Sequence, residues 1–237
     1  MLINLMTFFW FLSSVVWAGP VEDLQIASNP NLSVDLRMSA FDRLVLLGAT
    51  DVRVIREYCL GEDKELRSRW VAIRVMGKVG GAPAREVLPL LSVSDQPVIR
   101  AAAVSAIGDM GNTEYLDTVI VRLKDEAILV RAAAAESLGK LKDTRALEPL
   151  ENVFNAPDSR YQGASLWIRR HYIMAMGEIG DSSVYPTLLM ALNDDDPTVV
   201  LATVEALEKI SNFSFSDGRT PLEEQEAWRR WLNDKLK

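Results

Sequence analysis

The sequence predicts an all-α protein, an α-solenoid of about six helical hairpins closed by a C-terminal capping helix. One motif recurs: Ile-Arg-Ala-Ala-Ala at 99–103 is followed 31 residues later by Val-Arg-Ala-Ala-Ala at 130–134. Around the arginine of this motif, apolar residues repeat at helical spacing through most of the chain. A fixed period of this length is typical of stacked units that each bury an apolar face against their neighbours.

The first segment, residues 1–18, contains no Asp, Glu, Lys or Arg and is predicted to be a signal peptide. Val16-Trp17-Ala18 places a small residue before a cleavage point at Gly19. The alternative is an uncleaved membrane anchor, at the short limit for crossing a hydrocarbon layer of about 30 Å. We therefore expect a periplasmic or secreted protein, with an inner-membrane anchored protein as the alternative. Residues 19–31 are a lead-in to the first unit.

Each unit is predicted to begin with an amphipathic helix. The six anchor positions are Arg37, Arg69, Arg100, Arg131, Arg169 and Val200. The residues four, seven and ten positions after each anchor are all apolar, and these offsets share one face of an α-helix. Eight positions after the anchor stand Gly77, Gly108, Gly139 and Gly177, which permit the close approach of a neighbouring helix.

A shorter second helix is predicted to complete each hairpin. The expected ranges are 52–60, 83–91, 113–123, 144–154 and 183–192. Glycine stands eleven positions after several anchors, as at Gly80 and Gly111, where a left-handed residue can end the first helix. Loops such as Asp195-Asp196-Pro197 separate the units. The solenoid is predicted to span residues 32–213.

Two segments depart from the repeat. The spacing from Arg131 to Arg169 is 38 residues, which predicts an insertion of about seven residues within 155–165. Residues 214–237 are predicted to be a capping segment, with a helix over 221–237. Trp228 and Trp231 share a face of that helix and are expected to cover the last apolar surface of the array.

The V/I-R-x-A-A motif, the G-x-x-G at the end of the first helix and the D-x-P between units resemble the HEAT repeat, in particular the bacterial subtype named after phycocyanobilin lyases. The resemblance covers about residues 32–213. It implies a stacked α-solenoid whose second helices line a concave binding face, and it implies a protein-binding scaffold. Lyase activity is the less favoured alternative, because such lyases act in the cytoplasm and this chain begins with a predicted export signal.

Composition excludes several chemistries. One His and one Cys cannot form a zinc site of the Cys/His type, an iron–sulfur site or an internal disulfide. We therefore expect no metal, no cofactor, no catalytic residues and no enzymatic activity. A net charge of −7 disfavours nucleic acid, which needs a basic footprint. The predicted function is a monomeric scaffold or adaptor that binds another protein, with the soluble arm of a membrane-anchored complex as the alternative.

The arginine column is predicted to be structural. Arg37, Arg69, Arg100, Arg131 and Arg169 follow acidic loop residues such as Asp63, Asp95 and Asp125 by five or six positions. Each arginine is expected to bind the loop of its own unit or of a neighbouring unit. The alternative is a ladder that binds anions.

The binding candidates gather at the insertion and on the second helices. Tyr161, Trp167, Arg170 and His171 form an aromatic and basic cluster, and such residues dominate binding hot spots. The alternative is that Trp167 fills a gap in the core and His171 is an ordinary residue. On the second helices, Arg85, Glu114 and Tyr185 are expected to meet a partner on the concave face.

Overall fold

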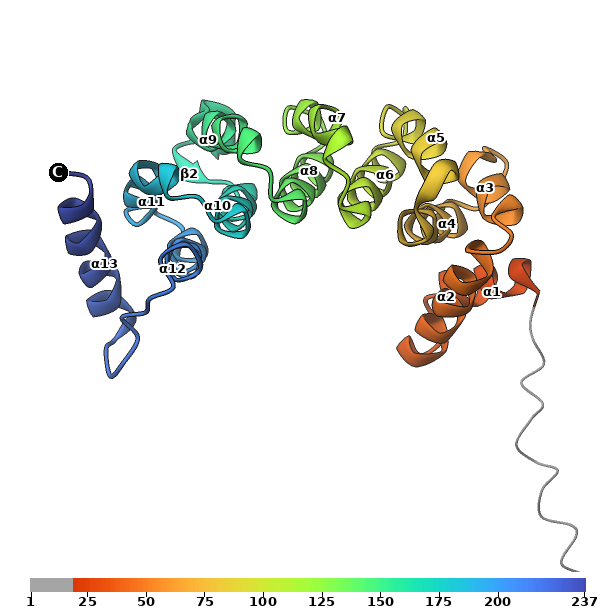
Figure 1. Cartoon of the computed structure of the whole chain (residues 1–237), viewed down its shortest axis with the longest axis horizontal. Helices are drawn as coiled ribbons and strands as arrows, with labels where there is room; N and C mark the ends of the chain where they lie inside the picture. The colour runs from red at the N-terminus through yellow and green to blue at the C-terminus, as the bar shows by residue number, and fades with distance from the viewer. Residues whose placement is uncertain (1–18) are drawn as a thin grey trace, which may run out of the picture.

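The computed structural model describes residues 19–237, so the predicted signal peptide lies outside the described residues (Figure 1). Among the described helices, none combines the length and the apolar character needed to cross a membrane. The fold is an all-α solenoid in which helical hairpins stack side by side.

The helices form two layers and two end segments. The first helices of the hairpins are α2 (Val34–Gly48), α4 (Leu66–Val79), α6 (Pro97–Met110), α8 (Ile128–Leu141), α10 (Ile168–Ile179) and α12 (Pro197–Ser211). The second helices are α3 (Arg53–Leu60), α5 (Gly81–Leu91), α7 (Leu116–Arg122), α9 (Leu147–Asn155) and α11 (Tyr185–Ala191). Short 3-10 turns η1 (Thr113–Tyr115), η2 (Thr144–Ala146) and η4 (Ser182–Val184) lead into the last three second helices.

The array is an arch, and its concave side is lined by the first helices (Figure 1). The second helices form the outer, convex layer. The expectation that the second helices line the concave face is therefore wrong. The physical reason is that the two layers pack with different closeness, which curves the array toward the more tightly packed one.

Glycine brings the first helices together. A Cβ added to Gly108 would lie 2.7 Å from the Cα of Ser137 in the next unit, and one added to Gly77 would lie 2.8 Å from the Cα of Ala106. Real Cβ atoms do not approach backbone so closely. Packing between successive units is concentrated in these first helices, so the inner layer is short and the outer layer is splayed.

The lead-in contains a helix that the sequence analysis did not predict, α1 (Pro20–Ser28). It packs against both α2 and α4 and buries Leu24. The buried carboxylate of Asp23 accepts hydrogen bonds from Nε and Nη2 of Arg43, the latter at 2.5 Å. The first hairpin is therefore covered by α1.

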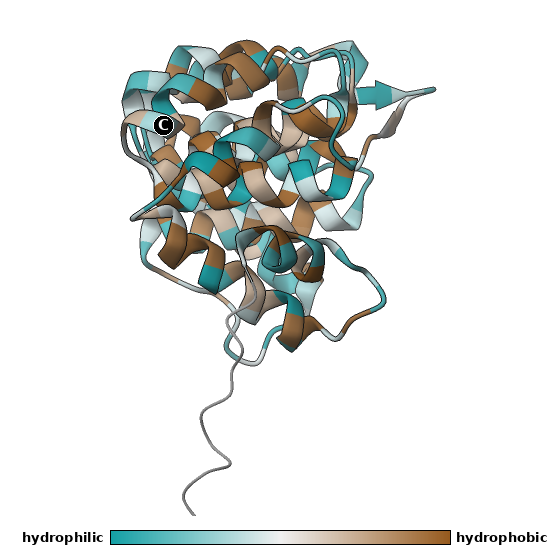
Figure 2. Ribbon diagram, turned by 90° about the vertical axis from the view of Figure 1, so that its right-hand side faces the viewer, coloured by the Kyte–Doolittle hydropathy of each residue, from teal (hydrophilic) through white to brown (hydrophobic). Residues whose placement is uncertain are grey.

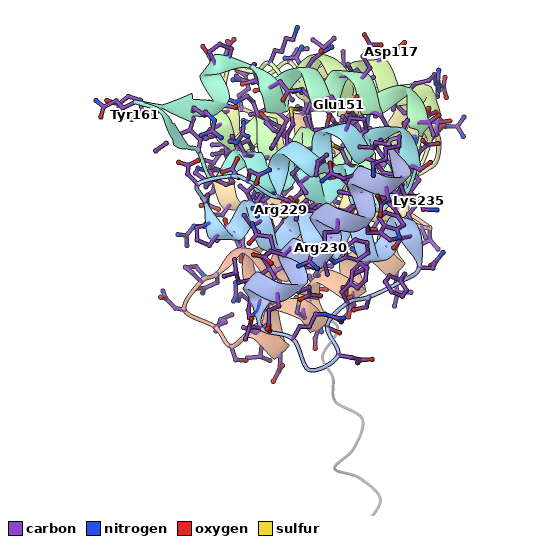
Figure 3. The ribbon with its side chains drawn as sticks, turned by 90° about the vertical axis from the view of Figure 1, so that its left-hand side faces the viewer. Asp117, Glu151, Tyr161, Arg229, Arg230 and Lys235 are labelled. Atoms are coloured by element: carbon purple, nitrogen blue, oxygen red, sulfur yellow. The ribbon has the colours of Figure 1, made fainter. Side chains whose placement is uncertain are left out.

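The other end is closed by α13 (Pro221–Lys235), which packs on α11 and α12. Trp228 is fully buried and makes edge-to-face contacts with Phe215 and Trp231. Arg229, labelled in Figure 3, donates a 3.0 Å hydrogen bond to the carbonyl of Leu192. Leu192 lies at the end of the preceding hairpin. Helix α13 therefore covers apolar surface and also supplies a hydrogen-bond donor to a carbonyl group at a helix end.

The insertion forms a small β-hairpin of β1 (Arg160–Tyr161) and β2 (Ala164–Ser165), preceded by the 3-10 turn η3 (Pro157–Ser159). It projects sideways from the array, with Tyr161 at its far end (Figures 2 and 3). Arg160 fixes its base, because its guanidinium lies 3.0 Å from Asp194 and 2.7 Å from Asp195. Figure 2 also shows that individual helices carry both apolar and polar residues, as the amphipathic pattern predicts.

Candidate functional site

The arginine column runs through the edge where the units are joined. Arg100 is buried and grips Asp125 of the next loop with Nε at 2.9 Å and Nη2 at 2.8 Å. Its Nη1 donates to the carbonyl of Ser94 in its own loop at 2.8 Å. One side chain thus ties two loops together through a bidentate, charge-assisted contact.

Arg169, the next anchor after the insertion, makes contacts of the same kind. Its Nη2 lies 2.8 Å from Asp194 of the next loop, and its Nη1 donates to Oγ of Ser159 at 2.8 Å and to the carbonyl of Phe154. The guanidinium also stacks 3.8 Å from the centroid of the Phe154 ring. Arg131 uses a carbonyl instead, that of Asp125 at 3.1 Å.

Two further members of the column, Arg69 and Arg37, also form no ion pair with the loop of the next unit among residues 19–237. The position corresponding to Asp125 is Ser94 for Arg69, which donates a 3.4 Å bond to the carbonyl of Cys59. For Arg37 the corresponding residue is Asp63, which lies 3.4 Å from Nζ of Lys64. Within residues 19–237 Arg37 forms no ion pair, and its buried Nε has no hydrogen-bond partner. At this end, α1 packs between the units and replaces the regular contact.

A ladder of alternating charge crosses the concave face, and the sequence analysis missed it. It occupies the position nine residues after the second to the sixth anchor, with Lys78, Asp109, Lys140, Glu178 and Lys209 in order; at the first anchor this position is Leu46. Nζ of Lys140 lies 2.7 Å from Asp109, and Lys209 pairs with Glu178. Because residues 31 apart face each other across adjacent helices, reading this column for sign would have found the ladder.

Asp109 is the centre of this ladder. Besides Lys140, its carboxylate lies 2.7 Å from Arg74 and 3.7 Å from Lys78. Burial acts to raise the pKa of Asp109, but the hydrogen bond from Lys140 and the charges of Arg74, Lys140 and Lys78 outweigh it and hold that pKa below its ordinary value. The ion pairs therefore stabilise the fold while Asp109 is ionised.

Replacing Asp109 with asparagine is expected to lower the free energy of unfolding by about 1–2 kcal/mol at pH 7, because three cations lose their shared anion. A lowered folded pKa means that the wild-type advantage is full above the unfolded pKa and is lost as the pH falls through the folded one. Chemical denaturation at pH 7 and pH 3 measures this. Glu178→Gln is the control, since its exposed pair with Lys209 should contribute less than about 0.5 kcal/mol. Equal losses in both variants would contradict the assignment.

Beside the charge ladder runs a row of exposed apolar side chains, which we call the inner row. It has one member on each first-helix segment from the second unit to the sixth: Trp70, Val98, Leu129, Trp167 and Leu201. These side chains are between 39% and 60% exposed. They lie two positions before or one position after the anchor, on the helix face opposite the second helices. The first helices of five successive units therefore each carry one exposed apolar side chain near their start.

The candidates at the insertion divide between this face and the hairpin. Trp167 belongs to the inner row and stands edge-on to His171 at 5.0 Å. His171 is buried, and its Nδ1 lies 3.1 Å from Oε1 of Glu136, a contact that lowers the pKa of Glu136. Arg170 is exposed on the same helix. Tyr161 is 67% exposed but lies at the hairpin tip, apart from this cluster.

The candidates on the second helices do not join the cluster. Arg85 and Glu114 are exposed on the convex layer. Tyr185 packs edge-on against Trp231 at 5.4 Å, so it belongs to the contact between α11 and the cap. The sequence pattern shows which residues face solvent, but the concave side depends on how the hairpins stack.

No cluster of His, Cys, Asp and Glu in residues 19–237 has an arrangement that could hold a metal ion. Cys59 is buried beneath the second unit, and this burial raises the pKa of its thiol to about 12. The reactive form of cysteine is the thiolate, so at neutral pH this thiol acts as a packed apolar group.

The chain is similar to known proteins in sequence pattern and in fold. The family of HEAT repeats matches residues 84–167 and 162–225. No curated protein matches the chain. Among solved structures, the complex of CpcE and CpcF of phycocyanin lyase from Nostoc sp. PCC7120 contains a chain with a TM-score of 0.58 and 21% sequence identity. The match covers 68% of this chain and 65% of that one, which is less than two thirds of the latter.

This likeness corrects one expectation. The prediction that the chain is not an enzyme is contradicted by this likeness, because a solved structure with this fold is a complex of a phycocyanin lyase. The solved structure that shares this fold is a complex of two different chains, CpcE and CpcF.

Proposed function

Because this chain belongs to the HEAT-repeat family, which matches more than half of its length, we propose that it is a protein-binding array that holds a partner along its concave face. The observation that carries the proposal is the inner row. Exposed apolar side chains that recur from unit to unit along one face of a solenoid are typical of a protein interface.

The composition of the inner row supports this surface over the convex one. Two of its members, Trp70 and Trp167, are tryptophans, and exposed Arg170 follows Trp167 by three residues; Trp and Arg are enriched in binding hot spots. The convex layer also exposes apolar residues, at Leu90, Val121 and Met190. That outer series is interrupted in the fourth unit by Asn152, which stands 31 residues after Val121.

Leu129→Asp is expected to weaken capture of the partner from the native host by at least tenfold, because it places a charge in the middle of the inner row. Leu90→Asp is the matched control, since Leu90 is the same residue type and is also exposed, at 60% against 40% for Leu129, but lies on α5 in the convex layer. The measurement is quantitative mass spectrometry of proteins that co-purify with each variant. A partner lost equally from both variants, or from neither, would contradict the proposal.

The compartment is part of the proposal. We place the protein in the periplasm or outside the cell, on the strength of the uncharged segment 1–18 and the small residue at Ala18. N-terminal sequencing of the protein from its native host is expected to give Gly19 as the first residue. A first residue of Met1 would favour the membrane-anchored alternative.

A lyase role is the second candidate, and the fold shared with the phycocyanin lyase complex is the observation that favours it. In such a role the concave face would hold the acceptor protein while a bilin is attached. Incubation with a bilin and a phycocyanin apoprotein would then produce a covalent adduct, seen as coloured protein after denaturation. If no adduct forms, whether this protein is tested alone or together with a second HEAT-repeat subunit, the lyase role is excluded.

A further inference from the structure

A cavity of about 360 Å³ lies at the N-terminal end of the inner row, where α1 and α2 meet α4 and the start of α6. Trp70 and Val98 form part of its wall, together with Leu66, Val71, Ala27 and Pro30. Its volume is in the range of small-molecule sites, which are usually apolar with a few placed polar groups.

The charged groups that line the cavity are both cations, and Ser28 adds a hydroxyl. Arg37 and Arg67 line the cavity, and no carboxylate does. Arg67 is exposed and makes no ion pair within residues 19–237, and neither does Arg37, whose corresponding loop acid, Asp63, lies 3.4 Å from Lys64. The Nε of Arg37 is buried and unpartnered among the described residues. A buried guanidinium N–H that lacks an acceptor is costly, so an acceptor supplied by a ligand would be favourable.

The surrounding charge is also distinctive. Helix α4 carries Arg67, Arg69, Arg74 and Lys78 and no acid between Leu66 and Val79. The nearest carboxylate on that segment is Glu65, which is engaged in capping α4 through the backbone N–H of Ser68 at 2.9 Å. Arg74 and Lys78 are paired with Asp109, so Arg37 and Arg67 are the two cations at the cavity that form no ion pair within residues 19–237.

We propose that this cavity binds a carboxylate carried on an apolar body, with the carboxylate between the guanidinium groups of Arg37 and Arg67 and the apolar body against Trp70. Guanidinium groups match carboxylates in geometry, and an indole face suits an aliphatic or aromatic chain. A free fatty acid and the C-terminus of a peptide with an apolar last residue share this chemistry. The site stands independently of a protein partner on the inner row.

The test compares charged and neutral probes of the same shape by isothermal titration with the purified protein. Octanoate is expected to bind at least tenfold more tightly than octan-1-ol, because only the carboxylate can accept from the two arginines. In the second arm, N-acetyl-Ala-Leu-Leu as the free acid is compared with its C-terminal amide. A tenfold preference for the peptide acid over octanoate assigns the site to a chain terminus, and the reverse assigns it to a free acid.

Three variants locate the site. Arg67→Gln and Arg37→Gln are each expected to weaken octanoate binding about tenfold, while Arg85→Gln, on the convex layer, leaves it unchanged. Arg67 is exposed, so its variant tests the site even if Arg37→Gln perturbs folding. Equal binding of octanoate and octan-1-ol, no binding of any acid at millimolar concentration, or unchanged binding in Arg67→Gln would overturn the proposal. These binding measurements are independent of partner capture along the inner row, which the Leu129→Asp variant tests.

Discussion

Gly108→Ala is expected to lower the free energy of unfolding by about 3 kcal/mol. The added Cβ would meet Oγ, Cβ and Cα of Ser137 at 2.5–2.7 Å, and a backbone atom cannot move aside as a flexible side chain can. The two first helices would have to separate, and each later unit of the array would shift with them. Thermal and chemical denaturation measure the loss.

Gly139→Ala is the matched control at the same repeat position. Its Cβ would lie 3.2 Å from Cα of Ala175 and 3.2 Å from Cβ of Glu178, distances that a small adjustment relieves. Alanine is also the better helix former by about 0.5–1 kcal/mol, which offsets part of the cost. We expect a net change within about 1 kcal/mol. A loss at Gly139 as large as that at Gly108 would contradict close backbone packing as the cause.

Arg100→Met is expected to lower the free energy of unfolding by about 3 kcal/mol, because it leaves a buried carboxylate without its partner. The side chain of Asp125 is only 4% exposed, and Arg100 provides its bidentate contact. Methionine keeps most of the apolar stem, so the loss reports mainly on the ion pair. Arg37→Met is the control from the same column. Its free energy of unfolding should stay within about 1 kcal/mol of wild type, since Arg37 forms no ion pair within residues 19–237.

The same pair predicts a pH dependence. Burial acts to raise the pKa of Asp125, but the hydrogen bond from Arg100, the backbone N–H of Ala127 and the charges of Arg100 and Arg122 together hold it below its ordinary value. The stability that this provides is present above the unfolded pKa of about 4 and lost as the pH falls through the folded one. The difference between wild type and Arg100→Met should therefore shrink from pH 7 to pH 3. A difference that stays constant with pH would point to lost packing instead.

Much of the fold follows from local pattern. The columns after each anchor placed the first and second helices to within about two residues, because helical periodicity is a local property of the chain. Helix α1 was missed because its nine residues bury only Leu24 and Asp23. The β-hairpin was missed because its two-residue strands have no alternating pattern to read.

The main error about the site was the prediction that the second helices line the concave face. An amphipathic pattern says which face of a helix meets its hairpin partner, but the concave side depends on which layer packs more closely. That information was present in the column of Gly77, Gly108 and Gly177, since glycine marks the layer with the shorter spacing. Arg37 is a different case: the corresponding loop acid, Asp63, lies 3.4 Å from Lys64 instead, a local contact that the repeat register does not predict.

The central claim is that the concave face of the first helices, and not the convex face, holds the partner. Photo-crosslinking tests it most directly, with p-benzoylphenylalanine placed singly at Leu129 and Trp167 of the inner row and at Leu90 and Val121 of the convex layer. We predict adducts of one partner from Leu129 and Trp167 and none from Leu90 or Val121. Adducts that form from the convex positions alone, or equally from all four, would contradict the claim.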